Sequence, residues 1–241
     1  MQNNEIGNLL KQENRYWWHV SRRIILQTFV QKIVQNNRIE KILDVGCGTG
    51  FNLQWLKKFG EVIGVDSNEE AVRLCNNRNI VAIQGNTDTL PSQIHGVSLV
   101  TAFDVLEHIE NDNRALQEWG RVLRPNGRLL LTVPAYQWLF GPHDKNLSHY
   151  RRYYLPDLIK KIENNGFKVI QSSYFFFLTL PLLIISRFVD RITNKTSGYQ
   201  EIPNWLNKLL IFSTSWEAKV IAKGYRLPFG SSILIYARKQ I

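Results

Sequence analysis

The stretch Ile42-Leu43-Asp44-Val45-Gly46-Cys47-Gly48-Thr49-Gly50 decides the fold of this chain. It joins a short apolar run to three alternate glycines. An apolar run that ends in glycine is typical of a strand buried on both faces of a sheet. The next residues, 51–59, carry apolar side chains at roughly helical spacing. We therefore predict a strand, a glycine loop and a helix. In such a unit a ligand lies over the carboxyl end of the strand, against the helix N-terminus, and glycines let it approach the main chain.

A second apolar run, Glu61-Val-Ile-Gly-Val-Asp66, predicts the neighbouring strand. It ends in an acid about twenty residues after Gly46. This is the spacing at which a carboxylate accepts hydrogen bonds from a ribose diol. Asp66, with Ser67 beside it, is therefore a candidate contact for a nucleoside-containing cofactor.

The glycine pattern also bears on the class of cofactor. The nicotinamide dinucleotide fingerprint requires glycine at its sixth position, where this chain has Phe51. The pattern D-x-G-x-G-x-G instead resembles class I S-adenosylmethionine (AdoMet)-dependent methyltransferases, in particular a bacterial small-molecule subgroup. The resemblance implies that the loop holds the methionine part of AdoMet through Asp44, Gly46, Cys47, Gly48 and Gly50. The alternative is a structural glycine turn in some other α/β protein.

Strand and helix patterns alternate along residues 41–134. Strands are predicted near 41–46, 61–66, 80–84, 97–103 and 128–133, and helices near 50–59, 68–77 and 112–124. Such alternation predicts an α/β fold with a doubly wound, mostly parallel sheet covered by helices on both faces. Two further strands are predicted, one starting at Phe167 and the last at 232–238. The resemblance implies a Rossmann-like sheet of seven strands, with the last one antiparallel beside the fifth.

The 241 residues suit one decorated domain, and the chain has no linker-like or repeated segment. We predict a single methyltransferase domain over residues 1–241. It comprises N-terminal helices (1–40), a Rossmann-like core (41–174 and 229–241) and a helical insertion before the last strand (175–228).

Two loops after predicted strands provide further candidate residues. In the resembling family an acid commonly follows the glycine of the Gly85 loop and receives the adenine amino group. Here that position is Asn86, whose amide oxygen can still accept from an amine, and Asp88 nearby is an alternative acceptor. Thr87 is a further candidate adenine contact. The next loop reads Phe103-Asp-Val-Leu-Glu-His-Ile109, as in many methyltransferases of this type. The resemblance places Phe103 and Asp104 toward the cofactor. His108 is a candidate catalytic base, although a histidine at this place is equally often structural.

The loop from Tyr136 to Leu155 is rich in histidine, tyrosine and arginine, and it leaves the carboxyl edge of the predicted sheet. Its histidines, His143 and His149, are candidate general bases. Its candidate substrate contacts are Tyr150, Arg151 and Arg152, because arginine binds phosphate or carboxylate. The spacing H-D-x-x-L-x-H-Y-R-R-Y resembles methyltransferases associated with cell-surface glycan or lipid pathways. The alternative is an ordinary loop with solvated arginines.

Two aromatic and apolar segments raise the question of a membrane. Trp17 lies in a Tyr-Trp-Trp-His cluster that precedes Arg22 and an apolar helix, and it is a candidate substrate contact in a lid, an interfacial anchor, or part of a helix packed on the sheet. The run Val169–Ser186 is uncharged, but Pro181 interrupts it. We expect an amphipathic insertion that contacts an anionic bilayer, or a cap against the domain or a second subunit.

Composition limits the partners and the compartment. The formal net charge is +10, but the basic residues are mixed with apolar stretches, and the Asn-Pro-Pro-Tyr signature of nucleic-acid amino methyltransferases is absent. We therefore predict no nucleic-acid partner. The two cysteines, Cys47 and Cys75, fit reduced packing residues, and we predict no metal site. The polar first residues show no signal peptide, which favours a cytoplasmic protein, peripheral at the inner face of the membrane if the insertion binds lipid.

These patterns predict an AdoMet-dependent methyltransferase that acts on a small-molecule, glycan or lipid-linked acceptor. Two alternatives remain: an NAD-dependent oxidoreductase of similar fold, and a non-catalytic AdoMet-binding adaptor at a membrane. The sequence leaves open the acceptor, the methylated atom, the need for a general base and the oligomeric state.

Overall fold

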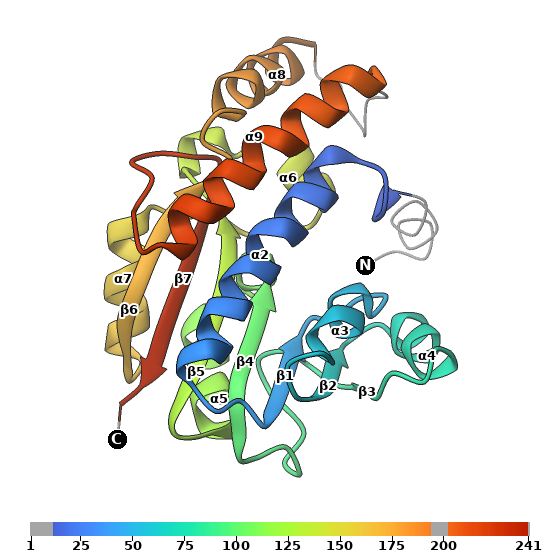
Figure 1. Cartoon of the computed structure of the whole chain (residues 1–241), viewed down its shortest axis with the longest axis vertical. Coiled ribbons are helices and arrows are strands. Elements are labelled where there is room, and N and C mark those ends of the chain that lie inside the picture. The colour runs from blue at the N-terminus through green and yellow to red at the C-terminus, as the bar shows by residue number, and fades with distance from the viewer. Residues whose placement is uncertain (1–11, 194–201, 241) are drawn as a thin grey trace.

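A computed structural model describes residues 12–193 and 202–240. Its centre is a seven-stranded sheet in the order β3-β2-β1-β4-β5-β7-β6 (Figure 1). The strands are β1 (Lys41–Val45), β2 (Glu61–Asp66), β3 (Ala82–Gln84), β4 (Val97–Phe103), β5 (Leu123–Pro134), β6 (Phe167–Phe175) and β7 (Ser232–Lys239). Strand β7 runs antiparallel to both of its neighbours, and the other pairings are parallel. The predicted fold class, including the position of the last strand, is confirmed.

Helices cover both faces of this sheet. They are α2 (Trp17–Asn36), α3 (Phe51–Leu56), α4 (Glu69–Asn77), α5 (Asp112–Val122), α6 (Pro142–Asn146), α7 (Leu155–Asn164), α8 (Leu180–Thr193) and α9 (Asn204–Ala222), with short 3-10 turns η1 (Leu106–His108) and η2 (Gln137–Leu139). One core cluster packs α5 and α7 on the sheet, and the other packs α2, α3 and α9. The central strands are apolar on both sides because each side of the sheet faces one of these clusters.

The fifth strand starts earlier than the sequence predicted. The predicted strand was near 128–133, after the turn-like sequence Arg124-Pro-Asn-Gly127, but β5 begins at Leu123, which pairs with Val97 across an irregular register. Asn126 takes a positive φ of 59°, so the chain kinks inside the strand without leaving the sheet. Tertiary pairing with β4 overrides the local turn signal here.

The predicted insertion consists of two helices. Phe176, with a φ of 59°, turns the chain out of β6, and Pro181 stands in the first turn of α8, where a missing amide proton costs no helical bond. Helix α9 lies along α2 (Figure 1), and Asn207 accepts a hydrogen bond from the Trp17 amide at 2.9 Å. Across residues 12–193 and 202–240, the helices fall short of the length and hydropathy that a membrane span requires. Residues 1–11 of the predicted N-terminal helices, and 194–201 of the insertion, lie outside the described residues.

Candidate active site

The glycine loop after β1 adopts a backbone that favours glycine. Gly46, Gly48 and Gly50 have φ values of 66°, 53° and 78°. A Cβ added to Gly46 would lie 2.5 Å from a Val105 methyl carbon, whereas a Cβ on Gly48 would meet no described atom within 4 Å. The loop is therefore packed against the protein at Gly46 and open at Gly48.

The main-chain amides of this loop bond within the protein. The amides of Gly46 and Cys47 both donate to the Val65 carbonyl, at 2.8 and 3.1 Å, and the Gly48 amide donates to Asp66 Oδ2 at 2.8 Å. The glycines thus tie β1 to β2 and fix the direction of the Asp66 carboxylate. This differs from our expectation that the glycines chiefly give a ligand access to the main chain.

Asp66 is held at the end of β2 with spare acceptor capacity. Its Oδ1 accepts from the Asn68 amide at 2.9 Å, and its side chain is half-buried, while Ser67 beside it is exposed. Each carboxylate oxygen can accept a second hydrogen bond. The geometry therefore fits the predicted contact with a ribose diol.

Asp44 is buried within β1, next to the glycine loop. It is 1% exposed, and Thr101 Oγ1 donates to its Oδ1 at 2.6 Å. Its Oδ2 has no hydrogen-bond partner among the described residues. Burial raises the pKa of Asp44 to about 7. A cationic ligand group would compensate this carboxylate, so the predicted role of Asp44 fits its surroundings.

Helix α2 closes over the end of β4. Arg22 Nε lies 2.6 Å from Asp104 Oδ2, and the Arg22 guanidinium also covers the rings of Phe103 and Trp18 at 5.8 and 5.4 Å. Trp17 instead contacts Phe176, with ring centroids 5.6 Å apart. Arg22 thus brings the N-terminal helix into contact with the site, and no sequence pattern beyond the Arg-Arg pair indicated this contact.

The predicted adenine loop follows β3 beside Asp66. The Gly85 amide donates to the Asp66 carbonyl at 3.0 Å, and Asn86 is exposed. The Thr87 carbonyl accepts from Trp119 Nε1 at 2.8 Å, which anchors the loop on α5. Asn86 and Thr87 therefore follow directly on the strand that pairs with β2, as the prediction required.

Two of the three predicted histidines come together. The rings of His108, on η1, and His149 lie edge to face with centroids 4.5 Å apart. Nδ1 of His149 lies 3.1 Å from Asp144 Oδ1. Burial of the His108 ring and the neighbouring His149 lower the pKa of His108 to about 4, although part of the side chain is exposed. His143, on α6, is half-buried, and burial and Arg187 lower its pKa to about 4.

The two predicted substrate arginines bond to carboxylates of the protein. Arg152 is 7% exposed and donates through Nε to Asp144 Oδ1 at 2.8 Å. Arg151 pairs with Asp112 Oδ2 at 3.1 Å and donates to the Glu110 carbonyl. Both guanidinium groups therefore fasten the loop in this structure, whereas we expected them to hold a phosphate or carboxylate of the substrate. Tyr150 remains 53% exposed beside them.

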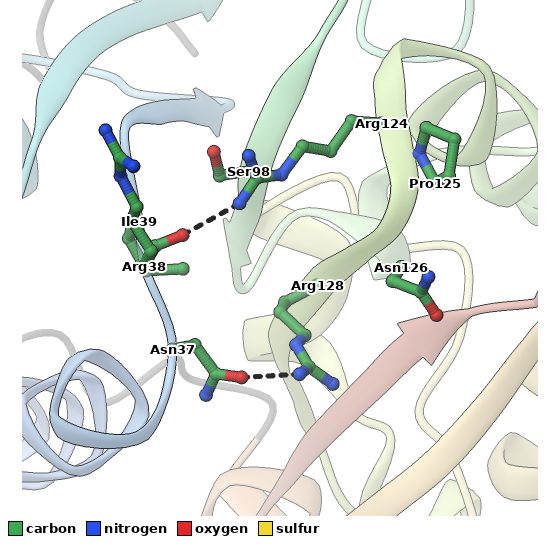
Figure 2. Close-up of a pocket in the computed structure, with 8 residues that line it drawn as sticks. All are labelled: Asn37, Arg38, Ile39, Ser98, Arg124, Pro125, Asn126 and Arg128. Carbon is green, nitrogen blue, oxygen red and sulfur yellow. Dashed lines mark hydrogen bonds between the residues drawn. The ribbon is translucent and has the colours of Figure 1, made fainter.

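A polar hollow of about 280 Å³ lies at the opposite edge of the sheet (Figure 2). It is lined by residues 37–39, Ser98, residues 124–126 and Arg128. Arg124 donates to the Arg38 carbonyl and Arg128 to Asn37. These residues precede or begin their strands, whereas ligands of doubly wound sheets bind beyond the carboxyl ends. The hollow is therefore separate from the candidate site.

Comparison with known proteins identifies the domain. Residues 43–131 match a family model described as a methyltransferase domain. This part of the chain is thus similar to a methyltransferase domain. Its glycine loop, Asp66 and the Asp104–His108 segment all lie within the matched range, whereas His143, His149 and the arginines lie beyond it.

Relatives and solved structures agree with this assignment. The chain is 36% identical over 137 residues to an uncharacterized 37.1 kDa protein in a transposon of Streptomyces fradiae, covering 53% of this chain and 39% of that protein. It is 31% identical over 111 residues to a probable S-adenosylmethionine-dependent methyltransferase of Mycobacterium tuberculosis, covering 45% and 40%. The chain thus spans about two-fifths of the length of these curated relatives. An S-adenosylmethionine-dependent methyltransferase from Mesorhizobium loti shares the fold, with a TM-score of 0.58 at 14% identity over 88% of this chain and 98% of that one.

Proposed function

We propose that the chain is an AdoMet-dependent methyltransferase. The observation that carries the proposal is the edge of the sheet at β1 and β2, where Asp44 has an unpaired buried oxygen, Gly48 faces open space and Asp66 has spare acceptors. The relative in Mycobacterium tuberculosis is named for the same cofactor. AdoMet supplies a methyl group that is already activated on a sulfonium.

The residues of this chain have separable tasks in such a reaction. Asp66 would hold the ribose and Asp44 would compensate positive charge, while Asn86 and Thr87 would accept adenine. Arg22, paired with Asp104 beneath α2, would exclude water from the end of β4. The chain then has to align the acceptor in line with the methyl–sulfur bond.

We further propose that the acceptor approaches beside His108 and His149. These rings adjoin the β4 end, and an imidazole there can remove a proton from an oxygen or nitrogen acceptor. A further relative, a ubiquinone biosynthesis O-methyltransferase of Coxiella burnetii, is 22% identical over 183 residues, covering 64% of this chain and 77% of that protein. The name of that relative supports an oxygen as the methylated atom.

Ligand binding separates this proposal from its alternatives. We expect S-adenosylhomocysteine to change the tryptophan fluorescence of the protein, because Trp18 and Trp55 border Arg22 and Phe103, and we expect NAD to have no effect. A response to NAD alone would favour the oxidoreductase. Binding of S-adenosylhomocysteine without methyl transfer from labelled AdoMet to any lipid or glycan extract would favour the non-catalytic adaptor.

We also propose that the protein works at the surface of an anionic bilayer. Helix α9 exposes one apolar stripe, Trp205, Leu209, Phe212 and Trp216, each at least half exposed. Helix α8, at the same end of the molecule (Figure 1), exposes further apolar side chains, Leu182, Ile185, Phe188, Val189 and Ile192. Surfaces of this kind mark membrane or protein contacts.

The charges around the stripe favour lipid over a second copy. The acids of the two helices, Asp190 and Glu217, are buried, whereas Lys208 and Lys219 on α9 are exposed. An anionic headgroup layer complements such a face. A second copy would bring the same lysines and a formal charge of +10 to the contact.

Vesicle binding tests the stripe. We expect the protein to sediment with phosphatidylglycerol vesicles more than with phosphatidylcholine vesicles. The triple variant Trp205→Ser/Phe212→Ser/Trp216→Ser should bind at least about ten-fold more weakly, because each aromatic loses roughly 1.5 kcal/mol or more of burial. Trp138→Ser, an exposed tryptophan on η2, is the control and should bind like the wild type. Equal binding by the triple variant, or a dimer in light scattering that the triple variant breaks, would overturn the proposal.

A further inference from the structure

Three side chains beside the proposed acceptor site converge on one point. Glu107, His108 and His149 each offer one ligand atom, and these atoms all lie within 4.8 Å of one another. Glu107 and His108 sit on η1, directly after β4, and His149 follows α6. The Tyr150 amide donates to the Glu107 carbonyl at 2.8 Å, which ties the two segments together.

Glu107 is the observation that requires a partner. Its side chain is fully buried, and neither carboxylate oxygen has a hydrogen-bond partner in any other described residue. The two arginines that interact electrostatically with Glu107 already form ion pairs: Arg22 with Asp104, and Arg152 with Asp144. A buried carboxylate in such surroundings lacks positive charge.

The two histidines are prepared as ligands. Asp144 Oδ1 lies 3.1 Å from His149 Nδ1, which fixes the ring and leaves Nε2 to face elsewhere. Asp144 is itself held by the Gly141 amide at 2.9 Å and by Arg152. Metal-binding histidines characteristically carry such a carboxylate on the second ring nitrogen. His108 directs a ring nitrogen to the same point, and a neutral imidazole has a lone pair available for a metal.

We infer that Glu107, His108 and His149 bind a first-row divalent cation. Two imidazoles and one carboxylate suit Zn²⁺, Mn²⁺, Fe²⁺ or Co²⁺ better than Mg²⁺ or Ca²⁺, which prefer all-oxygen sites. From the two cysteines we predicted no metal site, whereas the candidate site is formed by two histidines and a glutamate from separate segments. His108 is exposed, so coordination positions on that side are open to the acceptor.

A cation at this site would activate an oxygen acceptor for methyl transfer. This role rests on the proposed function. A hydroxyl that coordinates the cation loses its proton to solvent water more readily. Its oxygen then forms the bond to the methyl carbon, while the electron pair of the carbon–sulfur bond stays on sulfur. The products are the methyl ether, the neutral thioether and one proton.

Cobalt binding tests the site without any acceptor. We expect one equivalent of Co²⁺ added to the purified chain to give visible ligand-field absorption, and Zn²⁺ to abolish it by competition. Glu107→Gln and His149→Ala should each weaken Co²⁺ binding at least about a hundred-fold, because a metal site loses roughly 10- to 100-fold even from a lost outer partner. His95→Ala removes an exposed histidine elsewhere and should leave the Co²⁺ affinity unchanged.

The outcomes separate this inference from the proposed function. Binding of S-adenosylhomocysteine and the thermal midpoint are measured on the same samples, which shows whether each variant is folded. If the protein binds S-adenosylhomocysteine but not Co²⁺, the metal site is overturned. The proposed role of the His108 or His149 imidazole as a base would then remain. Equal Co²⁺ affinity in the wild type, Glu107→Gln and His149→Ala would also overturn the metal site. A wild-type protein that does not bind S-adenosylhomocysteine would overturn the proposed function instead.

Discussion

Replacing Asp66 by alanine is expected to weaken S-adenosylhomocysteine binding about a hundred-fold, since two charge-assisted hydrogen bonds to a ribose diol contribute roughly 1.5 kcal/mol or more each. The carboxylate is already aligned for this task by the Gly48 amide at 2.8 Å and the Asn68 amide at 2.9 Å. Titration calorimetry with S-adenosylhomocysteine measures the loss directly.

Two control variants separate ligand contact from loop structure. Asp66→Asn keeps one oxygen acceptor, so it should lose less affinity than Asp66→Ala. Asp157→Ala removes an exposed acid in the first turn of α7 and should bind as the wild type does. Because Asp66 is only half-buried, water can replace it at both amides, and the thermal midpoint should change little. An unchanged dissociation constant for Asp66→Ala would place the ribose elsewhere.

The sequence predicted the sheet well because its signals are local. Strands β1, β2 and β4 are short, mostly apolar runs next to a glycine, and they are buried between two helical layers. The pairing of His108 with His149 was also accessible in outline. Both residues follow neighbouring strands, β4 and β5, whose carboxyl ends meet at one edge of a parallel sheet.

What the sequence could not predict depends on tertiary partners. An Arg-Arg pair looks the same in the sequence whether its guanidinium groups contact solvent, a substrate or buried carboxylates. The contact between Arg152 and Asp144 becomes visible in the folded structure. The Arg22–Asp104 ion pair joins a helix that precedes the sheet to the end of its fourth strand, a separation that no local pattern encodes. Nor could the glycine pattern reveal that its amides bond to Val65 and Asp66.

Replacing Asp144 is expected to have the largest effect on stability. Its carboxylate is fully buried and is bonded by the Gly141 amide, Arg152 Nε and the ring of His149. Asp144→Ala leaves the Arg152 guanidinium, whose side chain is 4% exposed, without its carboxylate in the interior. Removing one partner of a buried pair costs about 3–5 kcal/mol, so the free energy of unfolding should fall by that amount in urea titrations at constant m-value.

A double-variant cycle shows whether the unpaired charge is the cause. Arg152→Met alone leaves Asp144 buried without its cation, whereas Asp144→Leu/Arg152→Met leaves no buried charge, so the double variant should lose less free energy than the two single variants added together. Glu40→Ala is the control, because the Glu40 side chain is 51% exposed in its ion pairs with Arg38 and Arg124. It should cost less than about 1 kcal/mol. If the losses of unfolding free energy at Asp144 and Arg152 are additive, the two side chains stabilise the protein independently. The loop from Tyr136 to Leu155 would then not be held in place by this ion pair.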